Sequence, residues 1–155
     1  GRIWSRAGIE EEADILIDDD GKWHEKFEQY VNDHNINVKH VIDCILVDEA
    51  QFLQPSVVEY LRRVTLDRKN HFGIPVICYG LKTDFRGVLF SGSKRLIELA
   101  DNIEEIKVTC QFCNKKAIMN MRFVNGKPTV EGNQIEIGDE AYVPSCFKCY
   151  YERLK

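Results

Sequence analysis

The sequence predicts an α/β fold in which helices flank a parallel sheet, with a small β-unit at the C-terminus. Two apolar runs, residues 40–47 and 76–80, have the length and polar borders of strands buried on both faces, as in parallel sheets. The segment between them has helical periodicity, and the order strand, helix, strand implies a right-handed parallel crossover. The alternation of strands and helices ends at Cys110, where the first of two cysteine pairs begins. We therefore expect two domains, residues 1–109 and residues 110–155.

Composition narrows the class of protein. The chain has 155 residues, of which 44% are hydrophobic and 30% charged, and this suits a globular protein with a substantial core. Its formal net charge of −4 disfavours a nucleic-acid partner, since nucleic-acid binders are more often basic. No apolar run approaches the roughly 18 residues of a membrane span, so we expect no membrane partner.

The first elements of the chain are a short strand and a helix. Residues 13–17 suit a strand, and residues 22–32 suit an amphipathic helix that packs on the sheet. That helix places Trp23, Phe27 and Tyr30 at helical spacing. A polar connection then leads to the first apolar strand.

The middle of the chain continues the α/β pattern. A helix is expected from the proline after Gln54 to about residue 67, and its inward-facing residues are Val57, Val58, Leu61 and Val64. After the second apolar strand, Ser93 can cap a helix that runs through Leu99. Residues 103–109 suit a third strand.

The C-terminal β-unit is predicted from shorter signals. Residues 117–124 and 134–137 resemble strands of a small antiparallel sheet. Asn125-Gly126 is a hairpin signal, because both positions of the favoured two-residue turn require a positive φ angle. Residues 147–154 suit a short helix.

Four of the six cysteines form two CxxC pairs, Cys110 with Cys113 and Cys146 with Cys149. Two CxxC turns supply four thiolates for a tetrahedral zinc site, which is structural because no position remains open for water. The alternative is a redox pair, for which one motif would suffice. Cys44 and Cys78 occur singly in apolar runs and are expected to be small core residues. This usage favours a reducing, cytosolic setting.

An acidic pair, Asp48-Glu49, ends the first apolar strand. Open α/β sheets bind their ligands at the carboxyl ends of strands, and an acidic residue there is typical of a Walker B element, whose Asp helps to hold Mg²⁺. Glu49 can then act as a general base in phosphoryl transfer to a hydroxyl. The alternative is the N-terminus of a helix, where the helix dipole stabilises the negative charges of Asp and Glu.

Aromatic residues occur near the ends of both predicted strands. Phe52, Phe85 and Phe90 can be core residues, or they can enclose a flat base by stacking and burial. Lys82 and Arg86 in the same loop face either phosphate or water.

Taken together, these motifs resemble one family, the cellular-type, zinc-containing thymidine kinases, from about residue 4 to residue 154. The resemblance rests on Asp48-Glu49-Ala50-Gln51-Phe52, on residues 79–87 after the next strand, and on the two CxxC pairs. It implies a parallel P-loop-type sheet and a zinc-bound β-unit that carries a lasso loop. It also implies transfer of the ATP γ-phosphoryl group to the 5′-hydroxyl of thymidine or deoxyuridine.

The resemblance implies roles for single residues as well. Glu49 matches the base that takes the hydroxyl proton, and Asp48 matches the position that organises Mg²⁺ through water. Residues 126–143 resemble the lasso loop over the nucleoside. The positions that match nucleoside-binding residues are Phe52, Leu81, Phe85, Phe90, Asn120 and Tyr142. Feedback inhibition by thymidine triphosphate, a homotetramer and a cytoplasmic location are also implied.

The sequence departs from the family at its start, because no GxxxxGK[ST] phosphate-binding motif occurs in it. The chain thus looks like a fragment, and the 155 residues alone are expected to have no appreciable kinase activity. Two rival interpretations remain open. One is another P-loop ATPase, since residues 48–51 also match the DEAQ box of helicases. The other is a non-enzymatic zinc-ribbon interaction module.

Overall fold

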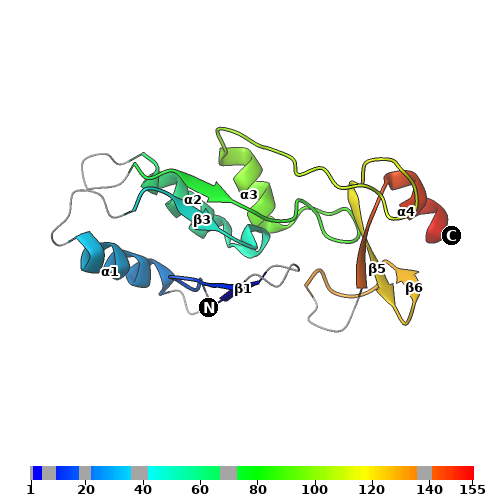
Figure 1. Ribbon diagram of the computed structural model, residues 1–155, viewed down its shortest axis with the longest axis horizontal. Coiled ribbons are helices and arrows are strands. Elements are labelled where there is room, and N and C mark those ends of the chain that lie inside the picture. Colours follow the sequence, from blue (N-terminus) through cyan, green and yellow to red (C-terminus); the bar gives the residue numbers. More distant parts are fainter. Residues whose placement is uncertain (1, 5–9, 18–21, 36–41, 67–72, 136–140) are drawn as a thin grey trace. The chain divides into compact units, whose positions relative to one another are not determined.

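The computed structural model describes residues 2–4, 10–17, 22–35, 42–66, 73–135 and 141–155 (Figure 1). Helices, one parallel strand pair and two antiparallel sheets make it a mixed α/β structure, as expected. The chain forms two compact units, which are described separately below. The first comprises Gly1–Asp48 and Val64–Ile77, and the second comprises Glu49–Arg63 and Cys78–Lys155. The domain division at residue 109 stays a prediction.

The first unit begins with an antiparallel hairpin and a helix. Strands β1 (Arg2–Trp4) and β2 (Glu10–Glu12) pair with each other, and Arg2 forms an ion pair with Glu10. The strand predicted at residues 13–17 is therefore wrong: the acidic residues before it pair instead. Helix α1 (Trp23–Asn35) confirms the amphipathic helix. It buries two of its aromatic residues, Trp23 and Phe27.

Strands β3 (Ile45–Val47) and β4 (Val76–Cys78) form the parallel pair. The amide of Ile45 donates to the carbonyl of Pro75 at 2.9 Å, and that of Ala50 donates to Tyr79 at 2.8 Å. Residue numbers rise together along both strands, so the strands run parallel, as the sequence predicts. A larger sheet of the P-loop type stays a prediction.

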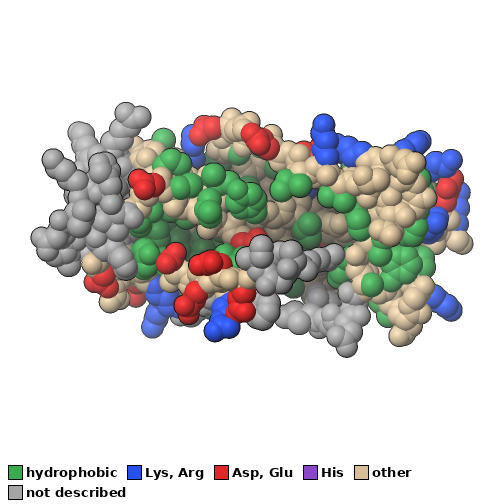
Figure 2. Space-filling model, in the orientation of Figure 1, with side chains coloured by type: hydrophobic (Ala, Val, Ile, Leu, Met, Phe, Trp, Pro, Cys, Tyr) green, Lys and Arg blue, Asp and Glu red, His purple; other side chains and the backbone are tan. Residues whose placement is uncertain are grey.

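Burial on both faces of these strands is not what the structure shows. Side chains alternate along β3, so Val47 is buried while Leu46 is 64% exposed. Ile77 on β4 is also exposed, and hydrophobic side chains gather on the surface over this strand pair (Figure 2). Cys44 is exposed, so its predicted place in the core is wrong. Cys78 is partly buried, and this burial raises the pKa of its thiol to about 11.

Helix α2 (Pro55–Val64) follows β3 and ends slightly earlier than predicted, with Thr65 and Leu66 in a turn. The apolar residues assigned to its inward face are all buried, which confirms the helical period: Val57, Val58, Leu61 and Val64.

The second unit begins with η1 (Ala50–Phe52), a single 3₁₀ turn, and later contains helix α3 (Ser91–Leu99). The predicted cap is wrong, because α3 begins before Ser93 and the Ser93 hydroxyl donates to the Leu81 carbonyl at 2.6 Å. The predicted strand at residues 103–109 is also wrong. Residues 102–108 belong to no strand and are exposed, and only Thr109 forms an isolated bridge, to Lys116.

The C-terminal part of this unit is a three-stranded antiparallel sheet in the order β6-β5-β7, followed by helix α4 (Phe147–Arg153). Its strands are β5 (Met119–Val124), β6 (Lys127–Thr129) and β7 (Ala141–Ser145). Asn125 and Gly126 join β5 to β6 with φ angles of 51° and 74°, which confirms the hairpin. A strand at 134–137 is not confirmed: residues 134 and 135 are outside strands, and 136 and 137 lie outside the described residues.

Candidate active site and metal centre

The acidic pair lies where the sequence places it, directly after β3. Asp48 and Glu49 are both exposed, so neither carboxylate is part of the core. Glu49 has a left-handed backbone conformation, with φ 51° and ψ 34°. This conformation costs a non-glycine residue about 1 kcal/mol or more, and such strain is concentrated at functional sites. The turn directs the chain from β3 into η1.

The side chain of Gln51 links this turn to the loop after β4. Its Nε2 donates to Oε2 of Glu49, and its Oε1 accepts the backbone N–H of Leu81 at 3.0 Å. The loops that follow two neighbouring parallel strands are therefore joined through one amide. Sequence reasoning gave Gln51 no role, although it stands within the quoted DEAQ motif.

Two of the predicted nucleoside-binding aromatics are in contact. The rings of Phe52 and Phe90 meet edge to face, with their centroids 5.6 Å apart. Phe90 is buried, whereas Phe52 is 49% exposed, so one ring supports the other and leaves a free face. Leu81, whose amide contacts Gln51, is also exposed.

Phe85 is enclosed by the C-terminal sheet and its helix. Its ring is 1% exposed, and the guanidinium groups of Arg86 and Arg122 lie 5.2 and 5.0 Å from its centroid. The hydroxyl of Tyr150 on α4 donates to the Phe85 carbonyl at 2.7 Å. Both the ring and the backbone of Phe85 are thus held by residues distant in sequence.

Buried Arg122 is a site residue that sequence reasoning missed. Besides contacting Phe85, it donates to the carbonyl of Glu131 at 2.7 Å and so holds the segment after β6. Its only signal in the sequence is a lone cation between the apolar residues Met121 and Phe123.

The two predicted residues on the C-terminal sheet lie on the same face as Arg122. Tyr142 pairs directly with Arg122 across β5 and β7, and Asn120 pairs with Pro144. Directly opposed residues, and residues two apart on one strand, point to the same face of a sheet. Asn120, Arg122 and Tyr142 therefore share one face, while Met119 and Met121 form the core on the other.

Asp84 holds the loop that carries Phe85. It is buried and accepts hydrogen bonds from the backbone amides of Arg86 and Val88, both at 2.9 Å, and from the Arg86 guanidinium at 3.0 Å. Gln134 also donates to it at 3.2 Å. Burial alone would raise the pKa of Asp84, but the hydrogen bonds and the Arg86 charge outweigh it and lower the pKa. Arg86 is therefore paired within its own loop.

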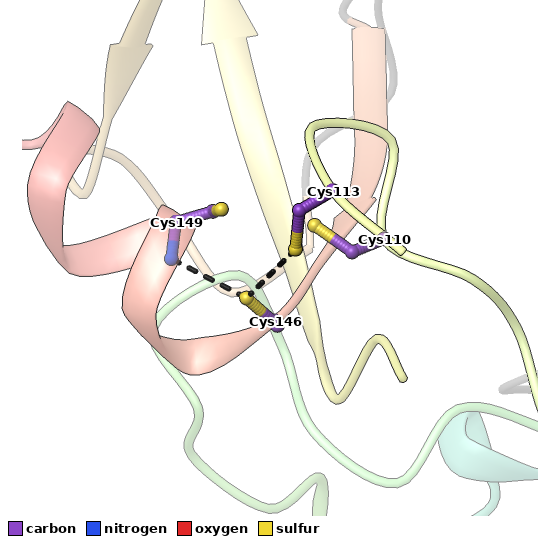
Figure 3. Close-up of side chains that lie close together, drawn as sticks. All are labelled: Cys110, Cys113, Cys146 and Cys149. Carbon is purple, nitrogen blue, oxygen red and sulfur yellow. Dashed lines mark hydrogen bonds between the residues drawn. The ribbon is translucent and has the colours of Figure 1, made fainter. Parts of the chain in front are cut away.

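The four predicted cysteines converge (Figure 3): the ligand atoms of Cys110, Cys113, Cys146 and Cys149 all lie within 4.8 Å of one another. The sulfurs of Cys113 and Cys146 are 3.7 Å apart. A tetrahedron with metal–sulfur bonds of about 2.3 Å places its sulfurs about 3.8 Å apart. Each CxxC turn also donates one backbone amide to its first sulfur, Phe112 to Cys110 and Cys149 to Cys146, both at 3.4 Å.

The charges of the cluster fit a bound cation. Burial opposes ionisation of Cys110, but backbone hydrogen bonds outweigh it and lower its pKa to about 6. The pKa of Cys149 is raised to about 12, chiefly by burial and also by the neighbouring sulfurs. Four sulfurs this close together repel one another as thiolates unless a metal ion neutralises them, and the donor set is the one that Zn²⁺ prefers.

The described residues thus define an α/β protein with an acidic pair at the end of a parallel strand and a four-cysteine cluster suited to a metal. None of its described helices is both long and apolar enough to span a membrane. The family model described as "Thymidine kinase" matches residues 2–150. The chain belongs to the thymidine kinase family.

Curated relatives agree with this assignment. The thymidine kinase of Lactococcus lactis subsp. lactis is 42% identical over 153 residues, which cover 98% of this chain and 74% of that protein. The thymidine kinase of Enterobacteria phage T4 is 45% identical over 154 residues, with coverages of 99% and 74%. That of Streptococcus pyogenes serotype M3 is 50% identical over 109 residues, with coverages of 70% and 56%. The helicase-like and zinc-ribbon alternatives are not favoured.

Proposed function

We propose that the protein is a thymidine kinase, which transfers the γ-phosphoryl group of ATP to the 5′-hydroxyl of thymidine or deoxyuridine. The observation that carries the proposal is the family match across residues 2–150, which includes every predicted site residue. The arrangement of two loops at one end of a parallel strand pair supports it, since ligands of α/β sheets bind there.

The acidic pair supplies the proposed chemistry. Glu49 takes the proton of the 5′-hydroxyl while the oxygen of that hydroxyl attacks the γ-phosphorus of ATP. The bond between the γ-phosphorus and the oxygen that bridges to the β-phosphate breaks, and ADP is released. Asp48 would hold Mg²⁺, which when bound would supply positive charge to neutralise the phosphates. The exposure of both carboxylates supports these roles, because substrate and water can reach them.

The aromatic residues and the C-terminal sheet supply the proposed nucleoside site. The exposed face of Phe52 stacks against the base, and Phe90 supports that ring. Phe85 is buried, so its part is to shape the site together with Leu81. Asn120 and Tyr142 contact the nucleoside from the shared face of β5 and β7. The lasso proposed for residues 126–143 includes β6 and the start of β7, and residues 136–140 of it lie outside the described part of the structure.

The proposal also includes the remaining properties that the family resemblance implies. Zinc in the four-cysteine cluster is structural and organises the chain around β5 and α4. The sheet is of the P-loop type, with domains at residues 1–109 and 110–155. A homotetramer, feedback inhibition by thymidine triphosphate, a cytoplasmic location and a role in nucleotide salvage complete the proposal.

Glu49→Gln tests the proposed base, because it keeps the size of the side chain and removes its basicity. In the full-length protein we expect kcat to fall by about 10²–10⁴-fold. Thymidine affinity, measured by calorimetry, should largely survive.

The matched control is Glu98→Gln, which neutralises an exposed carboxylate on α3. It should leave kcat unchanged within a factor of about two, since surface changes of this kind have small effects. Near-normal turnover in Glu49→Gln would refute the role of Glu49, and full-length wild-type protein without thymidine phosphorylation would refute the function.

A further inference from the structure

Gln51 is a buried polar side chain next to the proposed catalytic base. It is 1% exposed, although it belongs to a loop and adjoins the exposed Glu49. Burying an amide is costly unless its donors and acceptor are satisfied. Both ends of the Gln51 side chain have partners, Glu49 at one end and Leu81 at the other. The contact therefore joins the exposed Glu49 carboxylate to a side chain that is itself held in place at both ends.

The hydrogen bonds also fix which way the amide points. The partner at Leu81 is a backbone N–H, which can only donate, so the atom facing it must be Oε1. The other end must then be the NH₂ group, which faces the Glu49 carboxylate as a donor. A flipped amide would lose both bonds, so the donor is directed at Oε2 of Glu49 by the loop after β4.

Close backbone packing holds Gln51 in this place. A Cβ atom at Gly80 would lie 2.5 Å from Oε1 of Gln51, and one at Gly92 would lie 2.7 Å from its carbonyl oxygen. Both distances are shorter than real Cβ contacts allow, so two glycines make room for η1 between the β4 loop and α3. The backbone of Ala50 adds its bond to Tyr79 at 2.8 Å.

We infer that Gln51 is a positioning residue for the phosphoryl-transfer reaction: by donating to Oε2 it fixes the orientation of the Glu49 carboxylate, which takes the hydroxyl proton. The inference rests on the proposed role of Glu49 as the base. It also ties the position of the base to Leu81, so the loop that borders the nucleoside sets where the base lies. Gln51 itself touches no reacting atom in this scheme.

Gln51→Glu is the test variant, because it keeps the acceptor for Leu81 but replaces the NH₂ donor with a negatively charged oxygen, which repels the Glu49 carboxylate. In the zinc-loaded, full-length protein we expect kcat to fall about tenfold or more, since a base displaced by about 1 Å can cost a hundredfold. The KM for thymidine should stay within a factor of about two. Unchanged kcat would overturn the inference.

A matched control separates positioning from loss of structure. Ser93→Ala removes a buried hydrogen bond to the carbonyl of Leu81 without touching Glu49. It should lower the Tm while kcat falls less than about twofold. If Ser93→Ala lowers kcat as much as Gln51→Glu at equal loss of Tm, Gln51 is only structural and the inference fails.

The swapped pair Glu49→Gln with Gln51→Glu tests the contact without any assay of activity. The double variant again places one amide within hydrogen-bonding distance of one carboxylate, with the two groups exchanged between positions 49 and 51. It should therefore recover the Tm that is lost in Gln51→Glu alone. Absence of recovery would contradict the contact. An inactive wild-type protein would instead refute the proposed kinase function, while the Tm comparison would still report on the contact itself.

Discussion

The metal centre and the acidic turn after β3 are two small sites organised in opposite ways. The four cysteines come from two short CxxC turns, each of which sets its own sulfur geometry through a local amide. The acidic turn depends on contacts across about thirty residues, since Gln51 needs Leu81 and Ala50 needs Tyr79. The geometry of a metal site can therefore be set by local sequence, whereas the position of a catalytic base depends on the surrounding fold.

Removing one metal ligand should have the largest effect. Cys113→Ser replaces a thiolate with a poor ligand, and structural zinc sites contribute about 10 kcal/mol or more to folding. We expect the metal content to fall below one per chain and the C-terminal sheet to lose its tertiary near-ultraviolet circular dichroism. Elemental analysis of the purified protein measures the first effect.

The control for this variant is Cys44→Ser, an exposed cysteine outside the cluster. It should keep the metal content and the spectrum of the wild type. One metal per chain in Cys113→Ser would show that the four-cysteine site is incorrect, and a loss of metal in Cys44→Ser would show that the metal lies elsewhere.

Neutralising Asp84 should have an intermediate effect on stability. Asp84→Asn removes the charge that Arg86 pairs with inside the loop, at a cost of about 1–3 kcal/mol in the free energy of unfolding. Since the folded-state pKa of Asp84 lies below its ordinary value, the stabilisation is present above about pH 4. It is lost as the pH falls through the lower, folded-state pKa.

Urea unfolding of wild type and Asp84→Asn, at pH 7 and at pH 3, measures this effect. The difference between the two proteins should shrink at the lower pH. A difference that stays constant between the two pH values would show that the charge of Asp84 does not contribute.

Of these variants, Phe52→Ala should lower the stability of the protein least, and its main effect should be on thymidine affinity. Its ring is half exposed and contacts Phe90 edge to face, so Phe52→Ala should cost about 1 kcal/mol. In the proposed site, thymidine affinity should fall roughly three- to tenfold, as measured by calorimetry. Phe147→Ala truncates a similarly exposed ring on α4 and should leave affinity unchanged. Equal affinities in the two variants would remove Phe52 from the nucleoside site.

Local patterns in the sequence predicted the elements whose signals are short-range. The helical period of α2, the turn at Asn125-Gly126 and both CxxC pairs need only a few neighbouring residues, and each is present. Residues 103–109 show the limit of such patterns: a run with β-branched residues forms a strand only where another strand offers its hydrogen bonds.

The parts that could not be predicted depend on contacts between distant segments. No local pattern indicates that Arg122 lies over Phe85, or that Tyr150 donates to the carbonyl of Phe85. Leu46 is exposed for a similar reason, since burial of a strand depends on what covers each face and not on the strand itself. The positions of Asp48 and Glu49 were predictable because they adjoin a strand end.

Helix α4 supports both the four-cysteine cluster and the loop that carries Phe85. Cys149 belongs to the cluster, and the next residue, Tyr150, fixes the backbone of Phe85. In the proposed site, metal occupancy and nucleoside affinity are therefore linked equilibria, and linkage is reciprocal. Whatever factor the metal adds to thymidine affinity, thymidine must add to metal retention, so the substrate should slow the loss of zinc to a chelator.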